Sequence, residues 1–162
     1  MATLKGFLVL QNNLTRLSLD EAIGIVERAR VHARGIGLAV VITVVDSGGH
    51  LVALMRMDDA ILGSIDFEIT KAKTSILFNG PSEGLWAYCG PGGPAPATEF
   101  SNGGLIPYAG GVAFRNADGS LRGAIGVSGG LPEQDGLIAR AGLYSTVASE
   151  AVVRADKTED IT

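Results

Sequence analysis

Two segments of this chain have the pattern of a β-hairpin, in which two apolar strands flank a short glycine-containing turn. The turns are residues 46–49 (DSGG) and 116–119 (NADG), which have the composition that tight turns favour. The four predicted strands cover residues 38–45, 50–57, 111–115 and 121–128. Because hairpin strands run antiparallel and must bury at least one face, the two hairpins predict an antiparallel sheet covered by helices.

Helical patterns separate and flank the hairpins. Ser18 and Glu21 form a capping box that opens a helix over residues 19–34, and Gly35 ends it. Apolar residues at helical spacing predict further helices over residues 63–78 and 132–153, with a short one over 81–86. An additional strand over residues 6–10 gives an α/β (α+β) fold with a five-stranded antiparallel sheet flanked by helices. We expect residues 1–162 to form a single domain.

Composition excludes several classes of partner. The net charge of −4 argues against nucleic acid and against anionic membranes, because both require a basic face. Three features predict a cytoplasmic protein. The chain has a single cysteine, Cys89; it shows no cleavage-site pattern near the N-terminus; and it has no long apolar run. Charged residues are only 19% of the chain, so we expect apolar surface to be hidden in an even-numbered homo-oligomer built from dimers.

The chain resembles the GlcG/HbpS family, also called the haem-degrading domain family, which includes the C-terminal domain of PduO-type proteins. The matching segments are SLDEAIGIVERA, VVDSGGHLVALMRMDDA, KAKTSILF, GGLIPYAGGVAF and GSLRGAIGVSGGLPEQDGLIARAG, within residues 18–145. The resemblance implies a profilin-like fold and assembly into dimers and higher oligomers. It also implies a small-molecule ligand, because some members bind haem or a corrinoid.

Two basic residues are candidates for holding an anionic ligand. Arg56 stands where a strand gives way to a helix, and a guanidinium there can bind a carboxylate through two parallel hydrogen bonds. The alternative is an ion pair of Arg56 with Asp58 or Asp59 that fixes the corner. Lys73 lies in the matched KAKTS segment and either reaches an anionic ligand or faces solvent.

The end of the last strand and the turn after it are a second candidate. Gly126 and Ser128 leave a shallow trough on one face of the strand, shared with Arg122, unless a helix packs against the bare backbone. Gly129 and Gly130 come just before the N-terminus of a helix, where free N–H groups can bind an anion.

The long loop over residues 89–104 contains three prolines and five glycines, so it cannot be regular structure. Gly104 and the aromatic Tyr108 flank it and are candidate ligand contacts; aromatic residues there also suit a subunit interface. His50, at a hairpin tip, is a candidate axial ligand for haem. The sequence contains no cluster of cysteine and histidine residues that would indicate a metal site.

The sequence leaves three functions open. The preferred one is an oligomeric protein that binds haem, another tetrapyrrole or a small anionic or aromatic metabolite, between loop 89–104, the Arg56 corner and the turn at residues 129–135. The second is a cofactor-free lyase or isomerase, in which Glu99 and Asp135 are catalytic. The third is a structural oligomer without a ligand.

Overall fold

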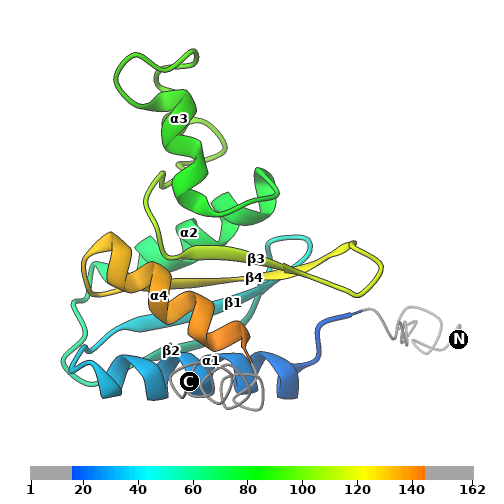
Figure 1. Ribbon diagram of the computed structural model, residues 1–162, viewed down its shortest axis with the longest axis vertical. Coiled ribbons are helices and arrows are strands. Elements are labelled where there is room, and N and C mark those ends of the chain that lie inside the picture. Colours follow the sequence, from blue (N-terminus) through cyan, green and yellow to red (C-terminus); the bar gives the residue numbers. More distant parts are fainter. Residues whose placement is uncertain (1–15, 145–162) are drawn as a thin grey trace, which may run out of the picture.

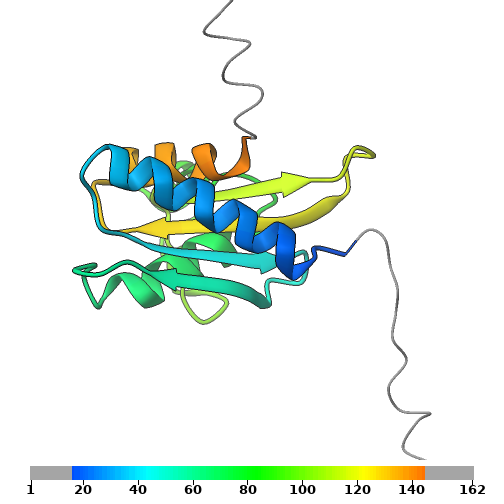
Figure 2. The ribbon, with the colours of Figure 1, turned by 90° about the horizontal axis from the view of Figure 1, so that it is seen from below.

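The computed structural model describes residues 16–144, which form a sheet with helices on both faces (Figure 1). The helices and strands are α1 (Leu19–Gly35), β1 (Val41–Asp46), β2 (Leu51–Arg56), α2 (Ser64–Leu77), η2 (Ser82–Leu85), α3 (Trp86–Cys89), η3 (Thr98–Phe100), β3 (Gly111–Arg115), β4 (Leu121–Ser128) and α4 (Pro132–Leu143). Helices α1 and α4 lie side by side across one face of the sheet (Figure 2), and α2 covers the other.

The sheet has four antiparallel strands in the order β2-β1-β4-β3. Both predicted hairpins are confirmed, and β1 and β4 join them at the centre, with Val41 opposite Ser128. A fifth strand over residues 6–10 lies outside the described residues, as does the part of the last helix predicted beyond residue 144. Both central strands are almost entirely buried, which explains their continuous β-branched sequence.

The main core lies between the sheet and the pair α1 and α4. Alternation along the strands sends Ile42 and Val44 of β1 and Ile125 and Val127 of β4 to this face, where all four are fully buried. The apolar stripe of α1 packs against them, and Ser18 caps the helix by accepting a hydrogen bond from the Glu21 N–H at 3.2 Å. The Ser18 cap therefore sets where α1 begins, and burial sets which side faces the sheet. The reciprocal half of the predicted capping box is not seen in the described residues, because the Glu21 carboxylate bonds to Arg122.

Helix α2 lies directly on the backbone of the opposite face. A Cβ atom at Gly126 would stand 1.9 Å from the carbonyl oxygen of Glu68, and one at Gly111 would stand 2.3 Å from that of Lys71. Neither position can accept a side chain, because backbone already occupies the space. Gly126 therefore serves helix packing and does not form the open trough considered from the sequence.

The prediction that Arg122 shares a face of β4 with Gly126 and Ser128 was also wrong. The register between β3 and β4 shifts between Phe114 and Arg115, next to Arg122 on the partner strand. Such an irregularity reverses the simple alternation of side chains. The guanidinium of Arg122 consequently bonds to Glu21 of α1 and Asn116, so it does not share a face with Gly126.

The segment between α2 and β3 projects beyond edge strand β3 of the sheet (Figure 1). It contains η2, α3 and the predicted irregular loop, whose only regular element is the single turn η3. Several backbone hydrogen bonds hold the loop together, among them those from the Ala95 N–H to the Tyr88 carbonyl at 2.9 Å and from the Leu105 N–H to the Glu99 carbonyl at 2.8 Å. Among the helices of residues 16–144, none is long and apolar enough to cross a membrane.

Candidate functional site

A buried ion pair joins α2 to the start of α4. The Lys71 ammonium donates to Asp135 Oδ2 at 2.7 Å and to the Val127 carbonyl at 3.0 Å, and both side chains are almost fully buried. Asp135 Oδ1 accepts from the Gly130 N–H at 2.9 Å. Burial raises the pKa of Asp135, while Lys71 and the N–H groups of Gly130 and Gly129 oppose that shift. The pair fixes the turn after β4.

This arrangement decides the role of the turn that was a candidate anion site. The Gly130 N–H is already bonded to Asp135, and Ser128 is 7% exposed. A Cβ atom at Gly129 would lie 2.6 Å from the carbonyl oxygen of Ala39. Gly126, Ser128, Gly129, Gly130 and Asp135 thus form an internal support, and none of them lines the clefts described below.

A second buried acid, Glu68, stands one turn before Lys71 on α2. Its Oε1 accepts from the Thr43 hydroxyl at 3.2 Å, and its Oε2 has no hydrogen-bond partner among residues 16–144. Burial raises the pKa of Glu68 to about 7, although Thr43 and the Lys71 charge act in the opposite direction. Sequence reasoning missed this group; the signal was the spacing of Ser64, Glu68, Lys71 and Ser75, a polar stripe that is the buried face of α2.

A cleft of about 820 Å³ opens between the start of α1 and the tips of the two hairpins. Its walls include Arg16, Leu19, Asp46, His50, Leu51, Leu121 and Arg122. Four leucines, the three named and Leu17, give it apolar surface, and both arginines are part of its lining. Of the residues predicted to bind a ligand, His50 is the one that this cleft contains. We call it the His50 cleft.

The ring of His50 is both exposed and oriented. Its Nδ1 lies 3.3 Å from Asp46 Oδ1, while 82% of the side chain is exposed to solvent. A Cβ atom at Gly48 would stand 2.7 Å from the same Nδ1, so the ring rests against a bare turn. Partial burial of Asp46 disfavours its charge, but the backbone N–H groups of His50 and Gly48 outweigh this and hold its pKa below the usual value.

A second, more apolar hollow of about 720 Å³ lies between α4, the η2–α3 segment and residues 107–109. Trp86 and Tyr108 stand in its wall with their ring centroids 6.1 Å apart and their planes tilted by 36°. We call it the aromatic groove. It contains Tyr108 from the predicted ligand contacts, together with Pro132 and Glu133 beside the turn that precedes α4.

The remaining predicted contacts lie elsewhere. Arg56 lines a shallow hollow of about 380 Å³ with Arg30 and Arg34 of α1, at the opposite end of β2 from His50. Within residues 16–144 it makes no ion pair with Asp58 or Asp59. The hollow lined by Arg56 contains no residue of the 129–135 turn or of loop 89–104.

Lys73 is exposed on α2, close to the turn at Gly49. Glu99 points toward Cys89, and burial together with the Glu99 charge raises the pKa of that thiol. Gly104 has a φ of +106° in open space. In the described part of the chain, no three His, Cys, Asp or Glu side chains are grouped to hold a metal ion.

Comparison with known proteins gives consistent relatives. A family described as "Haem degrading protein HbpS-like" matches residues 17–144. A 15.0 kDa uncharacterised protein of the dhaT-dhaS intergenic region of Citrobacter freundii is 32% identical over 130 residues, which are 80% of this chain and 92% of the relative. The corrinoid adenosyltransferase PduO of the same organism is 32% identical over 120 residues, which are 74% of this chain and 36% of PduO. The chain thus spans about a third of that enzyme.

A solved structure adds a ligand to the comparison. The crystal structure of the PduOC:heme complex matches with a TM-score of 0.74 and 30% identity, covering 79% of this chain and 93% of that one.

Proposed function

We propose, since this chain belongs to the HbpS-like family, that it binds a planar tetrapyrrole of the haem class in the His50 cleft. The family description and the PduOC:heme complex support a tetrapyrrole as the ligand class. The observation that carries the choice of site is the contact between His50 Nδ1 and Asp46, because it leaves the other ring nitrogen facing outward. That nitrogen, Nε2, has no partner among the described residues.

The residues of the cleft fit such a ligand. A histidine that donates its Nδ1–H to a carboxylate is the usual form of an imidazole ligand, because the carboxylate fixes the tautomer and makes Nε2 more basic. Leu19, Leu51 and Leu121 supply apolar surface for the ring, and Arg16 supplies a cation for its carboxylates, while Arg122 is already paired with Glu21. When bound, haem would bring an iron centre whose reactivity the protein tunes through its ligand and surroundings.

Asp46 and Gly48 act through His50. Asp46 accepts from two backbone N–H groups of its own turn, both at 2.9 Å, so its carboxylate is fixed before any ligand arrives. Gly48 leaves the space that the imidazole occupies. Asp46 and Gly48 are therefore positioning residues. Replacing either one should weaken binding, although the coordinating nitrogen of His50 remains.

Haem titration with two histidine variants tests the site. In the wild type we expect a Soret shift that saturates. His50→Ala should weaken binding at least tenfold, and Gly48→Ala should weaken it by a smaller factor because the ring loses its place. His32→Ala is the matched control, since His32 is the other histidine of the chain and is exposed on α1. Hydroxocobalamin, titrated in the same way, tests a corrinoid.

Three results would contradict the proposal. Absence of any Soret shift in the wild type would exclude haem, and equal affinities of the wild type and His50→Ala would move the ligand out of the cleft. Equal losses in His50→Ala and His32→Ala would show a surface effect common to both histidines.

We also propose self-association through the side of the molecule that carries β2. Helix α2 packs on β1, β3 and β4. The face of the sheet that α2 covers is therefore left uncovered at edge strand β2, where Leu54 is 39% exposed. Exposed large apolar residues are frequent from β2 to the start of α2: Leu51, Leu54, Ile61, Leu62 and Phe67. Such a concentration is typical of an interface.

Light scattering should therefore give an even multiple of the monomer mass. Leu54→Lys should shift the mass toward the monomer, because it places a charge on the open edge of the sheet. A monomeric wild type at micromolar concentration would refute self-association, and an unchanged oligomer in Leu54→Lys would place the interface elsewhere. Leu137→Lys, at a more exposed position on α4 (59% against 39% for Leu54), is the control.

A further inference from the structure

We propose that the aromatic groove is a second ligand site, which takes a small planar nitrogen heterocycle that is neutral or cationic. The site shares no lining residue with the His50 cleft, and the proposal does not depend on tetrapyrrole binding. The groove is bounded by α4 on one side and by Trp86 and residues 107–109 on the other. Its lining is mainly apolar, with a few charged groups, which is the usual character of small-molecule sites.

The wall of the groove is built to receive a flat ring. Trp86 is 48% exposed and Tyr108 is 46% exposed, although both are large aromatic residues that normally gain from burial. Their planes are tilted by 36°, and Leu137 of α4, 59% exposed, lines the groove with them. An aromatic ligand placed between these side chains would cover apolar surface that water now contacts.

The backbone behind the aromatic pair is held firmly. The buried Ser82 hydroxyl donates to the carbonyl of Tyr108 at 2.5 Å and accepts from the Gly111 N–H at 2.9 Å. A Cβ atom at Gly136 would lie 3.3 Å from that of Ala109, so α4 approaches the segment closely. The groove is therefore largely formed before a ligand enters, which lowers the entropic cost of binding.

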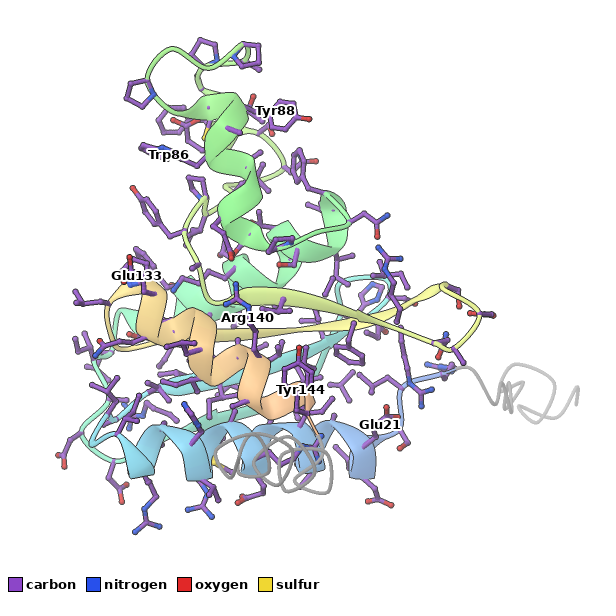
Figure 3. The ribbon with its side chains drawn as sticks, viewed as in Figure 1. Glu21, Trp86, Tyr88, Glu133, Arg140 and Tyr144 are labelled. Atoms are coloured by element: carbon purple, nitrogen blue, oxygen red, sulfur yellow. The ribbon has the colours of Figure 1, made fainter. Side chains whose placement is uncertain are left out.

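The charges around the groove select the class of ligand. Arg140 is the single cation of the lining and is already paired with Glu83, with Nη2 and Oε1 3.0 Å apart. Glu133 is exposed and makes no ion pair with any described residue. Figure 3 shows Glu133 at the start of α4 and Arg140 farther along the same helix. The available charge is therefore negative, and an anionic ligand would have to displace Glu83 from Arg140.

An amino-substituted or protonated nitrogen heterocycle satisfies both features. Its ring stacks on Trp86 and Tyr108, and a positive charge over an aromatic face adds a cation–π attraction. Its N–H groups can donate to the Glu133 carboxylate. An aromatic carboxylate of the same size could stack in the same way, but its negative charge would be repelled by the Glu133 carboxylate.

Trp86 makes the proposal directly testable, because it is the single tryptophan of the chain. We would titrate the protein with 2-aminobenzimidazole and with benzimidazole-2-carboxylate, which have the same bicyclic ring and opposite charge, and follow tryptophan emission. Saturable quenching is expected, with the amino compound binding about fivefold or more tighter. Glu133→Gln should remove most of that preference while leaving the quenching by the ring itself.

A pair of tyrosine variants distinguishes binding in the aromatic groove from nonspecific binding of aromatic compounds to the protein surface. Tyr108→Ala should weaken binding of the amino compound about fivefold, because it removes one stacking surface. Tyr88→Ala is the control: Tyr88 is comparably exposed on the same short helix as Trp86, and Figure 3 shows it on the opposite side of α3 from that residue. Quenching that does not saturate, a preference for the carboxylate, or equal effects of Tyr108→Ala and Tyr88→Ala would overturn the proposal. If tryptophan emission changes with protein concentration but not on addition of either probe, a second copy of the chain covers the groove. That result would also overturn the proposal.

Discussion

Glu68→Gln is expected to stabilise the protein by about 2 kcal/mol at pH 8 and to give no gain at pH 4. Glu68 is fully buried, its Oε1 has one hydrogen bond from Thr43, and its Oε2 has no partner in the described structure. Glutamine keeps the oxygen that Thr43 contacts and has nearly the same shape. It carries no charge at any pH, so it removes the cost of a buried carboxylate.

The sign of the pH dependence follows from the pKa. Burial raises the pKa of Glu68 from 4.5 to about 7 in the folded protein. The stability contribution of the protonated acid is fully present below pH 4.5 and is lost as pH rises through about 7, because the unfolded chain releases its proton first. The shift corresponds to a total of about 3 kcal/mol. Lys71 and Asp66 are the charged groups that modulate it, in opposite directions.

Denaturant unfolding at a series of pH values measures this effect. The wild type should lose stability between about pH 5 and pH 8, and Glu68→Gln should show a flatter profile in that range. Glu133→Gln, which removes an exposed carboxylate at the start of α4, is the control and should follow the wild type. A Glu68→Gln profile that runs parallel to that of the wild type would show that Glu68 does not titrate near neutrality.

The elements of the fold could be predicted because their signals are local. The turn residues around Gly48 and Gly119 and the capping box at Ser18 each act over a few residues, and each strand and helix has a periodicity of its own. The structure confirms the two hairpins, and it confirms α1 and α2 to within one or two residues of the predicted bounds. The irregularity near Arg122 changed the face of that residue, because one extra residue in a strand is not visible in the alternation of apolar and polar residues.

The arrangement of the candidate site could not be predicted in the same way. Lys71 and Asp135 are 64 residues apart, and nothing in either segment shows that the other lies beside it. Charged residues are also rarely fully buried, so nothing in the sequence indicated that Lys71 lies in the interior, and the candidate taken from the KAKTS segment was Lys73, with a solvent-facing role as its alternative. The helical spacing from Glu68 to Lys71 placed both on one face, but that face could be identified as buried only from the packing of α2 against Gly126 and Gly111.

Two of the predicted ligand contacts, His50 and Arg56, lie far apart for a geometric reason. His50 and Arg56 stand at the two ends of β2, six residues apart, which is about 20 Å along a strand. A hairpin signature shows that two strands pair, but it does not show which helix or loop meets each end of them. The structure instead groups His50 with Arg122 and Arg56 with Arg34.

Asp135→Asn is expected to destabilise the protein by about 3–5 kcal/mol, because it leaves the ammonium of Lys71 buried without its counter-charge. The asparagine side chain keeps an oxygen that can accept from the Gly130 N–H, so the loss reports on the charge more than on the turn. Lys71→Met should also destabilise, although by less at acid pH. Without its partner the Asp135 carboxyl can become neutral, and the pKa of this acid is already raised by burial.

The double variant Lys71→Met with Asp135→Asn should be more stable than Asp135→Asn alone, since no uncompensated charge remains in the interior. A double-mutant cycle from denaturant unfolding should give a coupling energy of about 2 kcal/mol or more. This result also bears on catalysis. An exposed proton shuttle at Asp135 would lose turnover on conversion to asparagine and keep its stability, whereas a buried support loses stability with any ligand or none. If Asp135→Asn remains within about 1 kcal/mol of the wild type, the ion pair does not hold the β4–α4 junction together.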